Sequence, residues 1–115
     1  SKNGLHILNV ETIFGSNSRV VISKNFQGGN ASCIFGSVTV FLNKADIHGS
    51  ISIQNFCIFG EITIIVPANF NIINNITSVL GSIEDKRNFL NETSNQKTIV
   101  LKGHVLFGSI NIKNF

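Results

Sequence analysis

The fold is decided by the stretch Ile58-Phe59-Gly60-Glu61-Ile62-Thr63-Ile64, whose pattern recurs along the 115-residue chain. An apolar pair precedes a glycine, and apolar and polar residues alternate after it. The pattern occurs five times, and successive glycines are 21, 24, 21 and 27 residues apart. The five glycines are Gly15, Gly36, Gly60, Gly81 and Gly108. A recurrent unit of this size is typical of stacked coils or repeated blades rather than of one irregular globule.

The alternation after the glycine predicts a strand with one buried face. Ile62 and Ile64 flank Thr63, and the second and fifth units repeat this order of apolar and polar residues. The first and fourth units are weaker, as expected for a terminal coil and for a coil that leads into a loop. The polar residues at their otherwise apolar positions are Asn17, Arg19 and Asp85.

The apolar pair before the glycine predicts a bend. A strand cannot point both Ile58 and Phe59 inward, because successive side chains lie on opposite faces. Gly60 has no Cβ, so it permits the chain to turn a corner there. Each unit is therefore expected to contain a strand, a corner at the glycine, and a second strand on a new face. Stacking of the units would form one file of side chains: Phe14, Phe35, Phe59, Leu80 and Phe107.

The spacers between the units contain further signals. Residues 20–22, 49–53 and 98–101 have strand-like composition, whereas turn residues gather at 27–30, 43–46 and 67–69. Apolar residues at helical spacing are missing, and β-branched residues and Asn are abundant, so no helix is expected. The longest spacer, at residues 85–97, is predicted to be a solvated loop. Its basic pair Lys86-Arg87 is its strongest candidate contact, although an ordinary solvated loop is the favoured interpretation.

These patterns predict an all-β protein with a single domain over residues 1–115. The favoured architecture is a single-stranded right-handed β-helix (β-solenoid) of about five short coils. The alternative is a β-sandwich of short antiparallel strands, which explains the strand count but not the repetition. The coils at the two ends, near residues 5–10 and at Phe115, are expected to present unpaired strand edges and to favour self-association.

Composition and charge limit the possible functions. The chain is 43% hydrophobic and 13% charged, with one proline, which argues against disorder and for a surface that associates with itself or a partner. The net charge of +3 comes from scattered residues without a basic run, so nucleic-acid binding is not expected. No segment approaches the roughly 18 apolar residues of a membrane span. Membrane attachment is therefore expected only through segments outside this chain.

The two cysteines occupy equivalent places. Cys33 and Cys57 each stand three residues before a repeat glycine, and the other units have compact residues there: Thr12, Ser78 and Val105. Stacked units would place the thiols on neighbouring coils, buried in a column of small side chains. The sequence leaves it open whether the two thiols form a disulfide. The bond is geometrically possible because adjacent strands lie about 4.8 Å apart.

The sequence predicts no catalytic, cofactor-binding or metal-binding residue, and the chain is not expected to be an enzyme. The three histidines His6, His48 and His104 lack metal-ligand spacing and are expected at the surface. The few carboxylates would have to meet from distant coils to form an acid pair. The repeated Gly-Ser is interpreted as structural, because a nucleophile would be needed only once.

The ordered motifs resemble the C-terminal domain of LiaF-type cell-wall-active antibiotic response proteins. Residues 58–67 are similar to the family's FG-x-[VI]-x-I-x-VP core. Residues 79–83 and 103–112 resemble its two later glycine motifs, and 26–37 resemble its F-x-GG…FG entry, so the similarity spans nearly the whole chain. The chain departs from the family in lacking its N-terminal transmembrane helices and in its long loop at 85–97.

The resemblance implies a function. LiaF-like proteins are membrane-anchored regulators that restrain a sensor histidine kinase in envelope-stress signalling, and the family has no known catalytic residues. The resemblance thus implies a bacterial, non-enzymatic regulatory domain at the cytoplasmic face of the membrane, with a protein partner or a homo-oligomer, although the periplasm and the cell surface stay open. The alternatives are a self-assembling structural protein like the bactofilin β-helices, and a surface adhesin or glycan-binding module.

Overall fold

The computed structural model describes residues 6–85 and 97–114, and over these residues the chain is built from strands and their connections. The prediction of an all-β protein is confirmed. The strands are β1 (Leu8–Val20), β2 (Gly28–Phe41), β3 (Ser50–Val66), β4 (Asn71–Ser78), β5 (Ser82–Asp85), β6 (Thr98–Val105) and β7 (Ser109–Asn114). In this part of the chain there is no helix long and apolar enough to cross a membrane.

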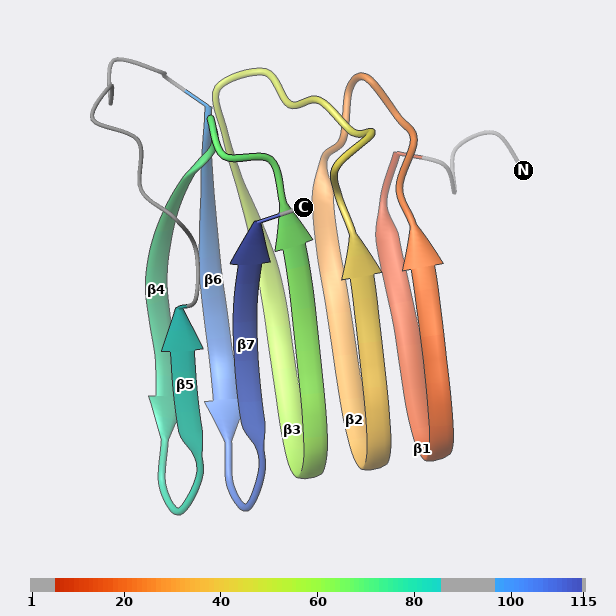
Figure 1. Cartoon of the computed structure of the whole chain (residues 1–115), viewed down its shortest axis with the longest axis vertical. Helices are drawn as coiled ribbons and strands as arrows, with labels where there is room; N and C mark the ends of the chain where they lie inside the picture. Colours follow the sequence, from red (N-terminus) through yellow and green to blue (C-terminus); the bar gives the residue numbers. More distant parts are fainter. Residues whose placement is uncertain (1–5, 86–96, 115) are drawn as a thin grey trace.

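Each repeat unit is a U with two legs (Figure 1). In the first three units β1, β2 and β3 each continue around the bend, whereas the bend separates β4 from β5 in the fourth unit and β6 from β7 in the fifth. The first legs lie side by side in one layer and the second legs in another. The bend falls at the repeat glycine, as the sequence predicts.

The units stack in parallel and in register. Phe14 pairs with Phe35, which pairs with Phe59, and the neighbouring glycines are aligned in the same way. All the strand pairings in the described residues are parallel. Equivalent positions of successive units therefore form columns that run the length of the stack.

The units do not stack in chain order. The first legs follow the order β1, β2, β3, β6, β4, and β7 pairs with both β3 and β5. The fifth unit therefore lies between the third and the fourth, as Figure 1 shows. The prediction that the last coil ends the stack is wrong: the fourth unit does. Phe115 itself lies outside the described residues.

The side chains that face the core explain this order. In the fifth unit Leu101 and Val105 are fully buried, and the fourth unit has Asn74 and Ser78 at the matching positions. Burying a polar group without a hydrogen bond costs free energy. The fifth unit therefore gains more from neighbours on both sides, and the fourth unit is better tolerated at the end. The first unit follows the same rule, because Asn17 and Arg19 stand opposite the buried Val38 and Val40 of the second unit.

The core fills the space between the two layers and continues beneath the connections opposite the bends. Between the layers it consists of aliphatic side chains such as Ile53, Ile62 and Ile64. The connections add buried apolar residues that close the other end of the layers: Phe26, Leu42, Ile47 and Phe70. The bend closes the opposite end, so the apolar interior is shielded except at the two ends of the stack.

The bends require glycine because the units approach one another closely there. A Cβ at Gly36 would lie 1.6 Å from the carbonyl oxygen of Gly15, and its φ of 129° is in the region that favours glycine. Glycine thus lets the backbones of neighbouring units stay at strand spacing around a sharp corner.

Some local predictions are confirmed and others are wrong. Residues 43–46 and 67–69 are connections, and residues 98–101 lie in β6. The sequence predicts a turn at residues 27–30, but residues 28–30 belong to β2, because parallel pairing with β1 extends through Gly29. Of residues 20–22 only Val20 is in a strand. Residues 86–96, with the pair Lys86-Arg87, lie outside the described residues.

Candidate interaction surface

A file of phenylalanine rings runs along the bends, as the sequence predicts. The ring centroids of Phe35 and Phe59 are 5.1 Å apart, as are those of Phe59 and Phe107, and both pairs are stacked within 8° of parallel. Phe14 extends the file with a centroid distance of 6.0 Å and a tilted ring. Leu80 of the fourth unit continues the file beside Phe107. The hydrogen bond from its backbone N–H to the carbonyl of Leu106 sets it at this position.

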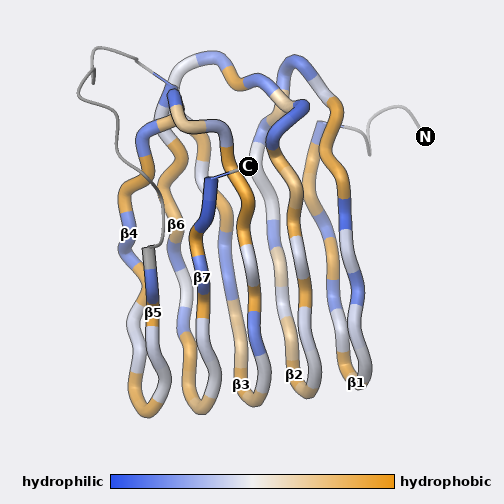
Figure 2. Tube along the Cα trace, in the orientation of Figure 1, coloured by the Kyte–Doolittle hydropathy of each residue, from blue (hydrophilic) through white to orange (hydrophobic). Residues whose placement is uncertain are grey.

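These rings are exposed to solvent. The three inner phenylalanines are between 43% and 50% exposed, whereas Phe14 is 87% and Leu80 68% exposed. Figure 2 shows hydrophobic residues at the bend of every unit. We call this surface the turn ridge, defined by its most exposed residues: Ile13, Phe14, Phe35, Phe59, Val79, Leu80 and Phe107. A contiguous exposed apolar surface of this kind typically marks an interaction site.

The two ends of the stack are the second exposed feature. Among the described residues β1 pairs with β2 alone, β4 with β6 alone and β5 with β7 alone. We call these surfaces the β1 end and the β4–β5 end. Each presents backbone donors and acceptors along a strand edge, which is a template for pairing with another strand. The two ends also contain the most exposed residues of the turn ridge.

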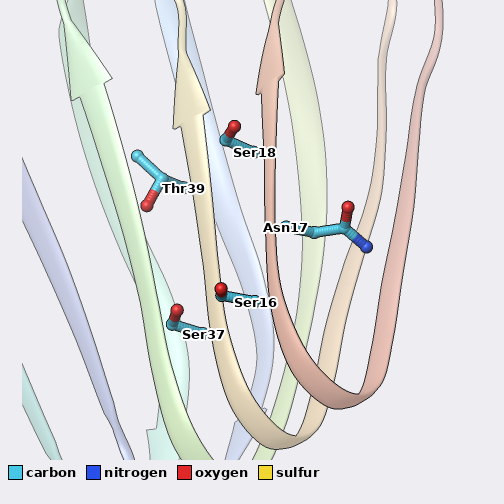
Figure 3. Close-up of a pocket in the computed structure, with 5 residues that line it drawn as sticks. All are labelled: Ser16, Asn17, Ser18, Ser37 and Thr39. Atoms are coloured by element: carbon cyan, nitrogen blue, oxygen red, sulfur yellow. The ribbon is translucent and has the colours of Figure 1, made fainter.

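A shallow polar hollow lies on the second legs of the first two units (Figure 3). It is lined by Ser16, Asn17, Ser18, Ser37 and Thr39. Asn17 points away from the hydroxyl row and donates from Nδ2 to the carbonyl of Glu11 at 3.3 Å. None of the five side chains titrates near neutral pH, so the hollow offers hydrogen bonds but no acid–base group.

The cysteines form the buried pair that the sequence predicts. Cys33 and Cys57 are register partners, both fully buried and both free thiols. Burial, and next the neighbouring Cys33, raise the pKa of Cys57 to about 11. Since the thiolate is the reactive form, this environment suppresses rather than activates the thiol. The predicted column is also confirmed, with Thr12 and Val105 next to the cysteines.

The titratable groups of the described residues do not gather into a site. No group of three metal-ligating side chains occurs among them. His6, His48 and His104 are exposed, as predicted, and lie on different units. Asp46 lies 2.6 Å from the Nζ of Lys97 and accepts from the N–H of Ile47. These two hydrogen bonds hold the pKa of Asp46 below its usual value.

Two buried polar residues, Asn55 and Asn111, are not predicted by the sequence pattern. Asn55 is buried and donates from Nδ2 to the carbonyl oxygens of Ile53 and Lys102, at 3.1 and 3.3 Å. Asn111 donates to the carboxylate of Glu61 in the neighbouring unit. The bonds from Asn55 to Lys102 and from Asn111 to Glu61 join adjacent units. Asn111 did carry a signal, because it occupies the column of Thr39 and Thr63, where each neighbour is polar.

Comparisons of the chain with models of protein families, with curated proteins and with solved structures give no match. The resemblance to LiaF-type proteins therefore stays a prediction from the motifs.

Proposed function

We propose that this chain is a non-enzymatic protein-interaction domain that associates with itself through the ends of its stack. The observation that carries the proposal is the state of the two ends. Within residues 6–85 and 97–114 each end is a strand paired on one side only, and Phe14 and Leu80 at these ends are more exposed than the inner residues of the turn ridge. Repeat proteins usually protect terminal units with polar capping repeats.

The end units combine capping features with exposed apolar ones. Asn17, Arg19, Asn74 and Ser78 replace core residues, which suits a surface that meets water. The bends of the same units nevertheless leave the turn-ridge residues Ile13 and Val79 exposed. Polar residues at the core positions let each end unit face water, whereas the apolar residues at its bend are stabilised when another molecule covers them. This combination favours reversible association.

The parallel stack supports the β-solenoid as the architecture behind this function, with each bend and connection completing one coil. The sequence motifs support a cellular setting: a bacterial regulator at the cytoplasmic face of the membrane that restrains a sensor kinase in the envelope-stress response. A structural polymer like the bactofilins is the second candidate, favoured by the open edges at both ends. Both roles are compatible with self-association through the ends, and they differ in what the assembled protein contacts.

Sedimentation velocity over a range of protein concentrations tests the proposal. The average mass of the wild type is expected to rise with concentration. Leu80→Asp is expected to suppress the rise, because it places a charge on an apolar contact. The matched control is Phe56→Asp, which makes the same kind of change on the outer face of β3, at an exposed residue in the middle of the stack. A wild type that stays monomeric at every concentration would exclude this function.

A further inference from the structure

We propose that copies of this chain join head to tail, with the β1 end of one copy pairing in parallel with the β4–β5 end of the next. This inference rests on the proposed self-association and adds its polarity and register. When the β1 end of one copy joins the β4–β5 end of another, every assembly keeps one free end of each kind. Further copies can therefore add to it without limit. The partner of each end is therefore a second copy of this chain.

The register follows from the columns of the stack. Ser16 pairs with Ser37, Ser37 with Glu61, Glu61 with Ser109, and Ser109 with Ser82. One more step in the same direction places Ser82 of one copy beside Ser16 of the next. Because every pairing inside the chain obeys this register, the junction would repeat a geometry that the sequence already adopts four times.

The apolar contact at the bend favours this pairing. In this register Leu80 of one copy lies beside Phe14 of the next, and Val79 lies beside Ile13. Phe14 is 87% exposed, against 43% for Phe59, which has a neighbour on each side. Coverage by a second copy would lower the exposure of both end residues toward that of the inner ones. The turn ridge would then run unbroken across the junction.

The two ends have residues of opposite charge in one register column. Arg19 belongs to the column of Val40, Ile64 and Ile112, and the residue that ends this column in the fourth unit is Asp85. The junction therefore brings a cationic residue level with an acidic one. Opposite charges at the same level favour this register, whereas like charges at that level would oppose it.

The glycines show that the stack has a direction. A Cβ at Gly36, Gly60, Gly108 or Gly81 would in each case meet the carbonyl oxygen of the glycine one unit nearer the β1 end, at 1.6 to 2.5 Å. A Cβ at Gly15 would meet nothing within 4 Å. The face of Gly15 that corresponds to the packed face of the other four glycines is therefore uncovered, and it is directed toward the β1 end. The proposed junction would place Gly81 of the next copy against that face.

Pairwise disulfide cross-linking tests the polarity. Ser16→Cys and Ser82→Cys are prepared as separate proteins, one with a cleavable tag, and are mixed under mild oxidation. Both positions are exposed, and neighbouring strands lie about 4.8 Å apart, within disulfide geometry. The mixture is expected to form the mixed dimer predominantly. A single chain with both substitutions is expected to form a ladder of multimers.

Two controls accompany this test. The wild type is expected to give no cross-link, because Cys33 and Cys57 are fully buried. Thr77→Cys replaces Ser82→Cys in the second control: it lies on the first leg of the same unit, where the register sets it level with Glu11 rather than Ser16. It is expected not to link to Ser16→Cys.

A charge exchange provides a readout without cysteine. Arg19→Asp is expected to weaken association by about tenfold or more, and Asp85→Arg in the same chain is expected to restore it. Predominant Ser16–Ser16 or Ser82–Ser82 dimers, or no cross-link in a protein that self-associates, would overturn the head-to-tail junction and leave the proposed function intact. A monomeric wild type would instead remove the proposed function.

Discussion

Phe35 and Phe59 lie face to face with their ring centroids 5.1 Å apart and their planes 6° apart, although they belong to different repeat units. This contact results from in-register stacking, since the two residues are direct register partners of β2 and β3. The rings are half-exposed, and their contact with one another covers apolar surface that would otherwise face solvent. The stack therefore carries an aromatic spine on its surface.

The spine predicts unequal effects of removing its rings. Phe59 has a stacked ring on each side, so Phe59→Ala is expected to lower the free energy of unfolding by about 1–3 kcal/mol. Phe14 has one tilted neighbour and is mostly exposed, so Phe14→Ala is expected to cost about 0.5–1.5 kcal/mol. Urea unfolding followed by circular dichroism, at a concentration where the protein is monomeric, measures both. Equal losses would contradict a spine stabilised by ring stacking.

Two alanine substitutions separate backbone strain from steric overlap. Gly15 and Gly36 both have positive φ, at 119° and 129°, so alanine at either costs about 1–3 kcal/mol in strain. A Cβ at Gly36 would also overlap the Gly15 carbonyl, so Gly36→Ala is expected to cost at least about 1–3 kcal/mol more, or to prevent folding. Thermal unfolding at low concentration compares them. A Gly15→Ala protein as damaged as Gly36→Ala would show that the close approach is unimportant.

The buried thiols predict slow modification. The pKa of Cys57 is raised to about 11, so at pH 8 very little thiolate is present, and both thiols are shielded. An aromatic disulfide reagent is expected to react with them only after urea unfolds the chain. Immediate reaction of the folded protein would contradict this burial.

The same thiol predicts a dependence of stability on alkaline pH. The folded protein holds the Cys57 proton more tightly than the unfolded chain, whose thiol has a pKa near 9.0. This contribution to stability is complete below pH 9.0 and is lost as the pH rises toward about 11. The free energy of unfolding is expected to fall over that range, and less in Cys57→Ala. A parallel decline in both proteins would assign the effect to other groups.

The Asp46–Lys97 pair predicts a dependence on acid pH. The pKa of Asp46 is lowered chiefly by its hydrogen bond with Lys97 and next by the N–H of Ile47. The contribution is present above the unfolded pKa of 3.8 and is lost as the pH falls through the lower folded value. Lys97→Gln is therefore expected to lower the melting temperature at pH 6, with the difference shrinking well below pH 3.8.

The control for this pair is Lys24→Gln, which removes a lysine whose Nζ donates to the carbonyl of Lys44 at 2.8 Å. A carbonyl does not titrate, so the effect of Lys24→Gln on the melting temperature is expected not to change at acid pH. The opposite pattern, with Lys24→Gln sensitive to pH and Lys97→Gln insensitive, would be inconsistent with the assignment.

The sequence by itself determined what belongs to every unit. The bend at Gly60, the alternation of Ile62, Thr63 and Ile64, and the partnership of Cys33 with Cys57 could all be predicted, because each depends on local chemistry repeated at a recognisable spacing. Parallel stacking then aligns like with like, since identical residues in register bury apolar area and satisfy the backbone together. The Phe file followed from the same reasoning, whereas its exposure to solvent is a result of the tertiary structure.

Only the tertiary structure decided the order of the units and therefore which surfaces stay open. Any unit can pair with any other, because all share one register, so local pattern does not say that the fifth unit lies between the third and the fourth. The difference comes from burial summed over a whole unit: Asn74 and Ser78 of the fourth unit are tolerated at an end, whereas Leu101 and Val105 of the fifth gain from cover on both sides. That choice is made by the assembled core, and it places Leu80 and Asp85 at the end of the stack.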